Sequence, residues 1–395
     1  MTTVVISPFD VAGFPTGGGH FWVYTQYAQG LLRLGCEVVW LERVPEELPE
    51  AATATFFDRM ERYGLGGNAF LYRDESEVPE AIARRADLLL NFDQRIDPAV
   101  LARFRRTALV DIDPGLLQFW MATGQLEIAP HDAHFTIGET VGTPAARFPD
   151  GGRSWVYTPP PVCLEAWPYS YGPDCEAFTT VSTWWGGNGK GEWVTDGDSL
   201  LFENNKRVSF LQLVELPLVT PQPLELALAL GEGDLVNGSD RPSSDGQGRR
   251  RHLPKDTDYV SDEDDRKVLE HHGWRLRDAQ DVARSPQLYA DYIRASRGEF
   301  SCVKPSCVRF QNAWISDRTL CYLASGKPVV VQDTGPSSFL PDGEGMFRFS
   351  SLEEAADALA HVNDDYERQC RAAREIAEAY FDSKQVLARI LDAVL

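Results

Sequence analysis

The stretch EFSCVKPSCVRFQNAWISDRTLCYLASGKPVVVQDTG, residues 299–335, decides the fold. Its first residues, EFSCV, alternate and are rich in β-formers, which predicts a buried strand. Ser316 is a suitable N-cap for a helix over 317–325, Gly326 ends that helix, and Pro328 opens the second strand, VVV. A strand, a short helix and a strand in this order predict a right-handed parallel crossover. The N-terminus of the helix then faces the carboxyl edge of the sheet, where open α/β folds bind ligands.

Arg318 lies in the first turn of that predicted helix. Free backbone N–H groups, the helix dipole and a guanidinium at one place make an anion site, best suited to phosphate. We therefore predict that Arg318 faces the cleft and binds a diphosphate there. The alternative is a surface arginine on a purely structural helix.

The segment DRTLCYLASGKPVVVQDTG resembles the donor-binding segment of GT-B-fold glycosyltransferases, in which a helix of the type EAMAxGxPVV precedes a glycine-containing loop. It is closer still to the CgeB-like, group 1 branch, which has RTFEIxACG; Arg318, Thr319, Gly326 and Pro328 match. The resemblance is good over residues 299–395 and fair over 1–45. It implies an α/β fold of two Rossmann-like domains facing a cleft. The donor-binding residues predicted in this part of the chain are Arg309, Ser316, Asp317, Arg318, Thr319, Asp333 and Gly335.

The pair of glutamates typical of these enzymes is absent. The glutamate that usually holds the donor ribose falls on Cys321, and its companion, eight residues earlier, falls on Ala313. The resemblance therefore leaves open how this chain would hold the nucleoside.

A strand-end arginine of the resembling enzymes is also missing, because Trp184 and Trp185 occupy its place. An indole can stack on a base or sugar, which makes Trp184 a candidate donor contact, but it cannot neutralise phosphate. Lys206, at the start of the next helix, corresponds to a lysine that holds donor phosphates in those enzymes. Lys206 and Arg318 are thus expected to carry more of that charge.

Length and composition favour a two-domain soluble enzyme. The chain has 395 residues, enough for two domains of Rossmann size, and 43% hydrophobic residues with ten Trp. Its net charge of −21 argues against nucleic acid or anionic membrane as a general partner. Seven widely spaced cysteines without a C-x-x-C suggest reduced thiols, and no signal peptide or membrane-length apolar run is visible. We expect a cytoplasmic protein of unknown oligomeric state, with no integral membrane segment.

The N-terminal residues predict a βαβ unit with a glycine-rich turn. A strand over 2–9 is followed by a loop containing Gly17, Gly18 and Gly19, a helix over 20–35, and the strand CEVVWLE. Three glycines before a helix are typical of the acceptor domain of GT-B enzymes, where backbone approaches the substrates closely. His20, at the start of that helix, is a candidate contact to the acceptor or the transferred sugar; the alternative is a capping or surface histidine.

A dinucleotide-binding dehydrogenase is a second interpretation of this βαβ unit, because Glu42 ends its second strand where a ribose-binding acid would lie. The fingerprint fails, however, since Trp22 occupies the place of the third glycine and the preceding loop is too long for the tight turn.

Three carboxylates follow predicted strands of the N-terminal half and are expected at one sheet edge. Asp111 and Asp113 end the strand TALVDID, and Glu139 ends AHFTIGE. Asp111-x-Asp113 also matches the D-x-D metal motif of GT-A glycosyltransferases, but the motif is short. Acceptor binding or proton transfer and simple turn formation are the other interpretations, and we predict no metal site.

The domain boundaries follow from composition. Residues 155–172 are rich in proline and aromatics and fit an interdomain linker. We predict an N-terminal acceptor domain over 1–165, a nucleotide-sugar donor domain over 173–380, and a final helix over 381–395 that packs back on the first domain. Residues 231–262 are polar, with an embedded RRRHLPK, and predict a solvated loop or a basic flap over the donor.

These expectations describe a metal-independent, hexosyltransferase-like glycosyltransferase with no cofactor, in which the nucleotide-sugar is a substrate. The acceptor would be a small molecule or a glycan. Catalysis would come mainly from holding the leaving diphosphate beside a positioned acceptor. Two further alternatives remain open: a nucleotide-sugar epimerase of the same fold, and a non-catalytic nucleotide-binding relative.

Overall fold

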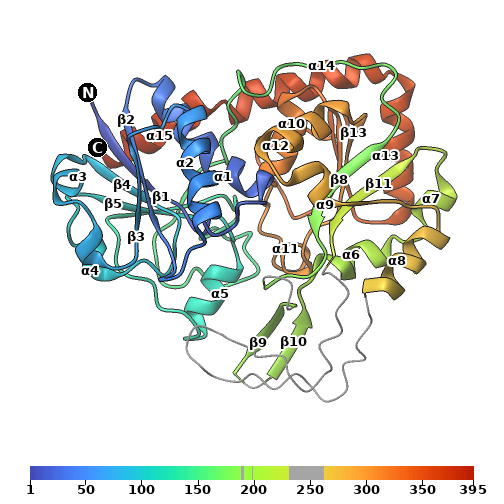
Figure 1. The fold of residues 1–395 in the computed structure, drawn as a ribbon. Coiled ribbons are helices and arrows are strands. Elements are labelled where there is room, and N and C mark those ends of the chain that lie inside the picture. The colour runs from blue at the N-terminus through green and yellow to red at the C-terminus, as the bar shows by residue number, and fades with distance from the viewer. Residues whose placement is uncertain (188–190, 198, 231–261) are drawn as a thin grey trace.

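A computed structural model describes residues 1–187, 191–197, 199–230 and 262–395 of the chain. Two α/β domains lie side by side, each with a parallel sheet between layers of helices (Figure 1). The predicted insertion 231–262 lies outside the described residues except for Asp262. In the ranges that are described, no helix combines the length and the apolar content needed to cross a membrane.

The N-terminal domain is built on a seven-stranded parallel sheet in the order β3-β2-β1-β4-β5-β6-β7. Its central strands are buried on both faces, as their unbroken apolar runs require when helices cover both sides of a parallel sheet. The strands are β1 (Thr3–Ser7), β2 (Glu37–Arg43), β3 (Ala69–Tyr72), β4 (Leu88–Asn91), β5 (Thr107–Asp111), β6 (Ala133–Thr136) and β7 (Val156–Tyr157).

The C-terminal domain repeats this plan with a six-stranded parallel sheet in the order β12-β11-β8-β13-β14-β15. Its strands are β8 (Phe178–Thr183), β11 (Leu224–Ala229), β12 (Arg275–Asp278), β13 (Gly298–Ser301), β14 (Val329–Gln332) and β15 (Met346–Phe349). In both sheets the strand order reverses between the first strand and the fourth, at β1/β4 and β8/β13. Open α/β sheets bind ligands at such a switch point, beyond the carboxyl ends of the strands.

The helix α1 (Gly18–Arg33) is buried on two faces because it lies between the two domains. One face, which includes Phe21 and Tyr24, belongs to the core of the N-terminal domain. The other face carries Trp22, whose indole N–H donates to the carbonyl oxygen of Pro286 at 3.0 Å in the C-terminal domain. The remaining helices of the N-terminal domain are α2 (Glu50–Arg62), η1 (Glu75–Glu77), α3 (Glu80–Arg85), α4 (Pro98–Leu101) and α5 (Leu116–Ala122).

The helices of the C-terminal domain surround its sheet, and the strand–helix–strand unit predicted around residues 299–335 is confirmed as β13, α12 and β14. A short helix, α11, precedes α12 in that unit. The helices are α6 (Lys206–Gln212), α7 (Leu216–Val219), α8 (Asp262–His271), α9 (Ala279–Ala283), α10 (Pro286–Ala295), α11 (Pro305–Phe310), α12 (Asp317–Ala324), α13 (Leu352–Asp364) and α14 (Tyr366–Ile376).

An antiparallel hairpin, absent from the sequence-based expectations, is inserted between β8 and α6. It consists of β9 (Trp193–Asp196) and β10 (Ser199–Glu203) and protrudes at the bottom of Figure 1. The hairpin reaches the N-terminal domain, where the side-chain amide of Gln125 donates to the carbonyl oxygen of Thr195 at 2.7 Å. It therefore bridges the two domains on that side of the molecule.

The chain crosses back to the first domain at its end. After α14 and η2 (Ala377–Phe381), the helix α15 (Ser383–Val394) packs on α1, with Val386, Leu387 and Ile390 in the N-terminal core. Both chain termini consequently lie at the N-terminal domain (Figure 1).

Candidate functional site

Two pockets lie at the carboxyl edges of the sheets, where the domains meet. The first pocket, which we call the donor-domain pocket after the role predicted for its domain, is formed by C-terminal residues, including Ser301, Ser316, Thr319, Gly335, Ser337 and Arg348. The interdomain pocket combines residues of both domains: Val23, Tyr27, Ile112, Ile137, Pro160, Pro161, Trp314 and Asp317. Trp314 forms a wall of both pockets, so the two spaces are neighbours.

The predicted N-cap of α12 is confirmed, because the Ser316 hydroxyl accepts a hydrogen bond from the Arg318 backbone N–H at 3.3 Å. The predicted orientation of the Arg318 side chain is wrong. Its guanidinium Nε lies 2.7 Å from a carboxylate oxygen of Glu299, while the other two nitrogens donate to the carbonyl oxygen of Val181 and the hydroxyl of Ser301 at 2.9 and 2.8 Å.

Arg318 is thus a buried structural group, with 7% of its surface exposed, and Glu299 is fully buried. The guanidinium ties α12 to β8 and β13 beneath the helix, and each of its three nitrogens donates a hydrogen bond within the protein. The expectation that this arginine stands free in the cleft and supports no packing is corrected. The physical reason is the carboxylate of Glu299, which no local pattern connects to the helix.

Lys206 is the cation that remains available at this edge. It lies in the first turn of α6, is only partly exposed, and makes no hydrogen bond or ion pair with a described residue. Burial, together with the positive charges of Arg318 and Lys304, lowers the pKa of Lys206 to about 7. An unpaired, partly desolvated ammonium beside other cations favours an anionic ligand, because the anion would restore its charged form.

The side chains of Asp317 and His20 belong to different domains, and they are close enough for their charges to interact. The charge of Asp317 acts on His20, whose ring nitrogen Nε2 lies 2.8 Å from the carbonyl oxygen of Phe9. Burial lowers the pKa of His20 and raises the pKa of Asp317, the latter opposed by Arg318 and Lys206. His20 and Asp317 were predicted from separate motifs, and the fold brings them to one place.

A charged pair that the sequence-based expectations omitted lies on the other side of the cleft. The ammonium of Lys304 is 2.9 Å from a carboxylate oxygen of Glu192, and the charge of Lys304 also acts on Asp113 of the N-terminal domain. Burial raises the pKa of Asp113, and the nearby Lys304 opposes that rise. The signal that could have identified this pair is Lys304 itself, the lysine directly after the strand of the central stretch.

The three glycines at the start of α1, Gly17 as its N-cap and Gly18 and Gly19 in its first turn, serve protein packing, which corrects their assignment as an acceptor loop. A Cβ on Gly18 would lie 2.3 Å from the carbonyl oxygen of Ser285, and one on Gly19 would lie 2.9 Å from the ring of Tyr289. A Cβ on Gly17 would collide with Phe14. The close backbone approach was predicted correctly, but its partner is the loop and helix α10 of the other domain rather than a substrate.

Asp111 is a structural carboxylate, so its assignment to the catalytic set is corrected. It is 3% exposed and accepts hydrogen bonds from Gln118 at 2.7 Å, from Thr136 at 2.9 Å and from the Asp113 backbone at 2.9 Å. Burial raises the pKa of Asp111 to about 6 against these hydrogen bonds. The turn-forming interpretation therefore describes Asp111. Among the described residues, no three His, Cys, Asp and Glu side chains converge on a common point.

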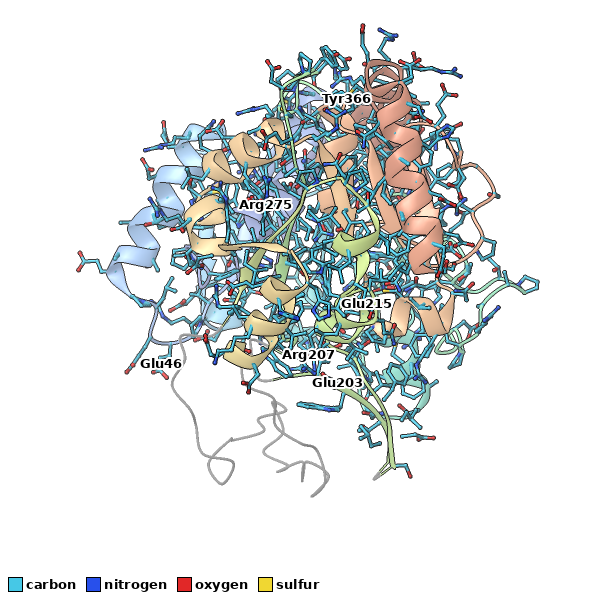
Figure 2. The ribbon with its side chains drawn as sticks, turned by 90° about the vertical axis from the view of Figure 1, so that its right-hand side faces the viewer. Glu46, Glu203, Arg207, Glu215, Arg275 and Tyr366 are labelled. Atoms are coloured by element: carbon cyan, nitrogen blue, oxygen red, sulfur yellow. The ribbon has the colours of Figure 1, made fainter. Side chains whose placement is uncertain are left out.

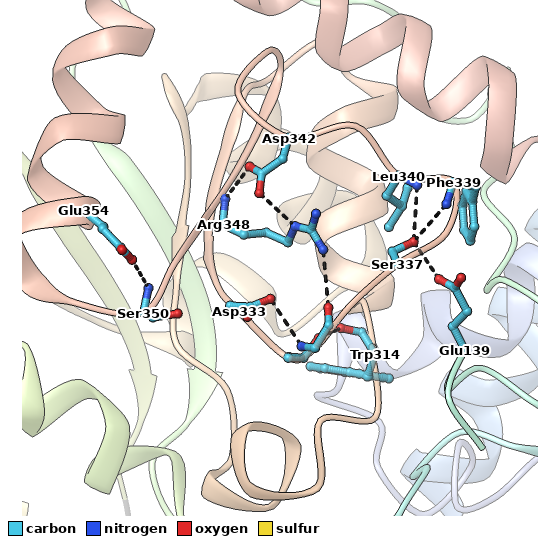
Figure 3. A network of polar contacts seen from close by, with 12 residues as sticks. Glu139, Trp314, Asp333, Ser337, Phe339, Leu340, Asp342, Arg348, Ser350 and Glu354 are labelled. Atoms are coloured by element: carbon cyan, nitrogen blue, oxygen red, sulfur yellow. Dashed lines mark hydrogen bonds and ion pairs between the residues drawn. The ribbon is translucent and has the colours of Figure 1, made fainter. Parts of the chain in front are cut away.

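Glu139 fastens the two domains together rather than facing Asp111. Its carboxylate accepts from the hydroxyl of Ser337 at 2.6 Å (Figure 3). It also accepts from the backbone N–H and the hydroxyl of Ser338 at 2.7 and 2.6 Å. The Ser337 hydroxyl in turn accepts from the backbone N–H groups of Phe339 and Leu340. With its acceptor oxygens used in this way, Glu139 is a poor candidate for proton transfer, and the prediction is corrected.

Asp333, labelled in Figure 3, and Gly335 shape the loop that follows β14. The Asp333 carboxylate accepts the Gly335 N–H at 3.2 Å, and Gly335 has a φ of 125°, which disfavours any side chain there. Arg348, held by Asp342 at 3.2 Å, donates to the Gly335 carbonyl oxygen. Gly335 and Thr319 line the donor-domain pocket together with Arg348.

Trp184 and Arg309 lie outside the cleft, which corrects their assignment to donor binding. Trp184 is fully buried and donates to Asp265 at 2.7 Å; the same carboxylate holds Arg207 through two contacts of 2.8 and 2.9 Å. Arg207 also lies beside Glu203 (Figure 2). Arg309 is exposed and stacks over Phe202 of the hairpin, 4.4 Å from the ring centre.

The two positions without glutamate lie close to contacts between the domains. Cys321 is 2% exposed and its sulfur accepts from Gln26 of α1 at 3.7 Å. Ala313 adopts a left-handed φ of 52°, unusual for a residue with a side chain. Next to it, Asn312 donates to the carbonyl oxygen of Pro114 in the N-terminal domain at 2.8 Å.

Comparison with known proteins identifies the architecture. No family profile matches the sequence, and no curated protein matches it. A structure of Anabaena HepE with UDP and glucose superimposes with a TM-score of 0.57 at 12% identity, covering 100% of this chain and 99% of its own. An alpha-glucosyltransferase in complex with UDP and a 13-mer DNA gives 0.55 at 10% identity, with coverages of 100% and 99%.

A third solved structure agrees with these two. AviGT4, a glycosyltransferase involved in Avilamycin A biosynthesis, gives a TM-score of 0.52 at 13% identity over 100% of this chain and 97% of its own. Likeness at such low identity shows the fold alone. The predicted fold class, two Rossmann-like domains in the GT-B arrangement, is confirmed, whereas the CgeB-like branch stays a prediction.

Proposed function

We propose that this protein is a glycosyltransferase that moves a sugar from a nucleotide-sugar donor to a hydroxyl-bearing acceptor, without a metal ion or another cofactor. The observation that carries the proposal is Lys206, a partly buried ammonium at the switch-point edge of the C-terminal domain that is paired with none of the described residues. The GT-B fold and the UDP named with two of the neighbouring structures support the same reading.

The chemistry follows from the charges at this edge. A departing nucleoside diphosphate gains negative charge, which Lys206 and the N-terminus of α12 would stabilise. The pKa of Lys206, about 7 in the free protein, would rise when a diphosphate binds, so the side chain would be fully charged in the complex. Arg318 contributes to this site indirectly, because its charge lowers the pKa of Lys206.

On the acceptor side, His20 and Asp113 remain the candidates. Both are partly buried at the N-terminal edge of the cleft, and each lies within electrostatic reach of a charged residue of the donor domain. Hexosyl specificity, membership of the CgeB-like branch, a cytoplasmic location and the exclusion of nucleic acid as a partner belong to the same proposal.

Calorimetric titration of UDP into three proteins tests the donor site. Lys206→Ala should weaken UDP binding by roughly 10- to 100-fold, since a hydrogen bond to a charged group contributes about 1.5–3 kcal/mol. Lys384→Ala is the matched control: it removes the same charge from α15, where Lys384 pairs with Glu165 at 2.8 Å. Equal affinities of Lys206→Ala and wild type would contradict the proposed donor site.

Activity separates the remaining candidates. Transfer of the sugar to an added acceptor supports the glycosyltransferase, release of an altered free sugar without an acceptor supports the epimerase, and UDP binding without turnover supports a non-catalytic relative. The absence of Glu side chains at positions 313 and 321 is the observation that keeps the non-catalytic candidate in consideration.

A further inference from the structure

The interdomain pocket has an unusually apolar lining for a sugar-handling protein. Its space is about 420 Å³, a figure that includes the solvent-filled mouth of the pocket. Val23 from α1, Ile112 and Ile137 beyond β5 and β6, and the linker residues Pro160 and Pro161 form its walls. Trp314 closes it toward the donor-domain pocket.

One polar side chain in this lining lacks a hydrogen-bond partner among the described residues, and a carboxylate lies near it. The Tyr27 hydroxyl is buried, in a residue with 2% of its surface exposed, and has no hydrogen-bond partner among the described residues. The Asp317 carboxylate makes no ion pair with a described residue. The charge of Asp317 acts on the Tyr27 hydroxyl, so the two groups lie near each other. Buried polar groups without partners are uncommon, and a ligand that supplies the missing hydrogen bonds explains them.

The lining selects a ligand class. A sugar carries hydroxyls over most of its surface, and each would need a partner that these walls do not offer. A phosphate or carboxylate would find no Lys, Arg or His to neutralise it among the described residues that line this pocket. A molecule with an apolar body and one hydroxyl satisfies both conditions, because its hydroxyl can donate to Asp317 and accept from Tyr27.

We propose that the interdomain pocket is the acceptor site and that it takes a small, largely apolar alcohol or phenol, whose hydroxyl is held between Asp317 and Tyr27. This inference rests on the proposed function. Asp317 begins α12, the helix whose N-terminus faces the proposed diphosphate site, and Lys206 acts electrostatically on it. A hydroxyl bound at Asp317 would therefore lie beside the donor.

Calorimetric titration of 1-naphthol into the full chain, with and without saturating UDP, tests the pocket directly. Tyr27→Phe should weaken naphthol binding by about tenfold. It should leave the melting temperature of the ligand-free protein unchanged or higher, because the lost hydroxyl had no partner. Tyr72→Phe, which removes a buried hydroxyl outside the pocket, should bind naphthol like wild type. Val23→Trp fills the pocket from its partly exposed side and should abolish binding.

Failure of wild type to bind 1-naphthol, or wild-type affinity for 1-naphthol in both Val23→Trp and Tyr27→Phe, overturns the inference.

The rate of sugar transfer to 1-naphthol gives the second readout. The donor in this assay is the nucleotide-sugar that produces the largest thermal shift. Asp317→Ala should raise the KM for 1-naphthol by at least tenfold and change the Kd for UDP less than threefold. Transfer to glucose or glucose 6-phosphate but not to 1-naphthol overturns the acceptor class and leaves the proposed function standing. Naphthol binding without UDP binding overturns the proposed function and the acceptor role together.

Discussion

Replacing Arg318 by alanine should destabilise the protein strongly. The guanidinium is paired with Glu299 at 2.7 Å, the arginine side chain is 8% exposed, and the glutamate side chain is 0% exposed. Removing one partner of such a pair leaves a buried charge without compensation, which costs about 3–5 kcal/mol. One carboxylate oxygen of Glu299 already lacks a hydrogen-bond partner, so no other described group is in place to take over.

The assay is urea unfolding at pH 7, followed by tryptophan fluorescence, together with UDP titration. Arg318→Ala should lower the free energy of unfolding by about 3–5 kcal/mol. The double variant Glu299→Met/Arg318→Met should recover most of that loss, because replacing a whole buried ion pair by apolar side chains is often neutral. Lys206→Ala should show the opposite pattern, with weaker UDP binding and no loss of stability.

One result would refute this reasoning. If Arg318→Ala unfolds like wild type yet binds UDP 10- to 100-fold more weakly, the guanidinium contacts the ligand, as the sequence alone suggested. The internal contacts to Glu299, Val181 and Ser301 would then not describe the functional state.

Three further predictions follow from the contacts described. Lys206 has a pKa of about 7 in the ligand-free protein and binds phosphate as a cation, so UDP binding should be accompanied by proton uptake. The affinity for UDP should fall by up to about tenfold per pH unit above 7, until the pKa of Lys206 in the complex is reached. Titrations in buffers of different ionisation enthalpy measure the proton uptake, and finding none would contradict this prediction. Glu139→Gln should weaken the link to Ser337 by about 1–2 kcal/mol and make the domains easier to separate, seen as faster limited proteolysis, whereas unchanged cleavage would argue against a latch. Asp265→Ala should detach α8 and lower stability by about 3–5 kcal/mol, because Arg207 loses its buried partner; hydrogen exchange in α8 is the measurement, and wild-type protection would exclude this role.

Local sequence was sufficient for the elements around the central stretch. The alternation in 299–303, the cap at Ser316 and the stop at Gly326, which has a φ of 68°, predicted β13, α12 and β14. The same holds for α1, whose periodic apolar residues predicted a helix. These features depend on neighbours within about four positions, so the sequence contains the information directly.

The roles of the candidate site residues depended on tertiary structure, because their partners are distant in the chain. Gly18 fits a domain contact at Ser285, Trp184 is buried against Asp265, and Glu139 holds Ser337. No periodicity or spacing connects such positions. Local preferences alone determined the strands, helices and caps of this protein. Which charges are neutralised inside the protein and which, like Lys206, remain for a ligand was decided only by tertiary packing. A charge is available or used according to the groups that folding brings within hydrogen-bond distance.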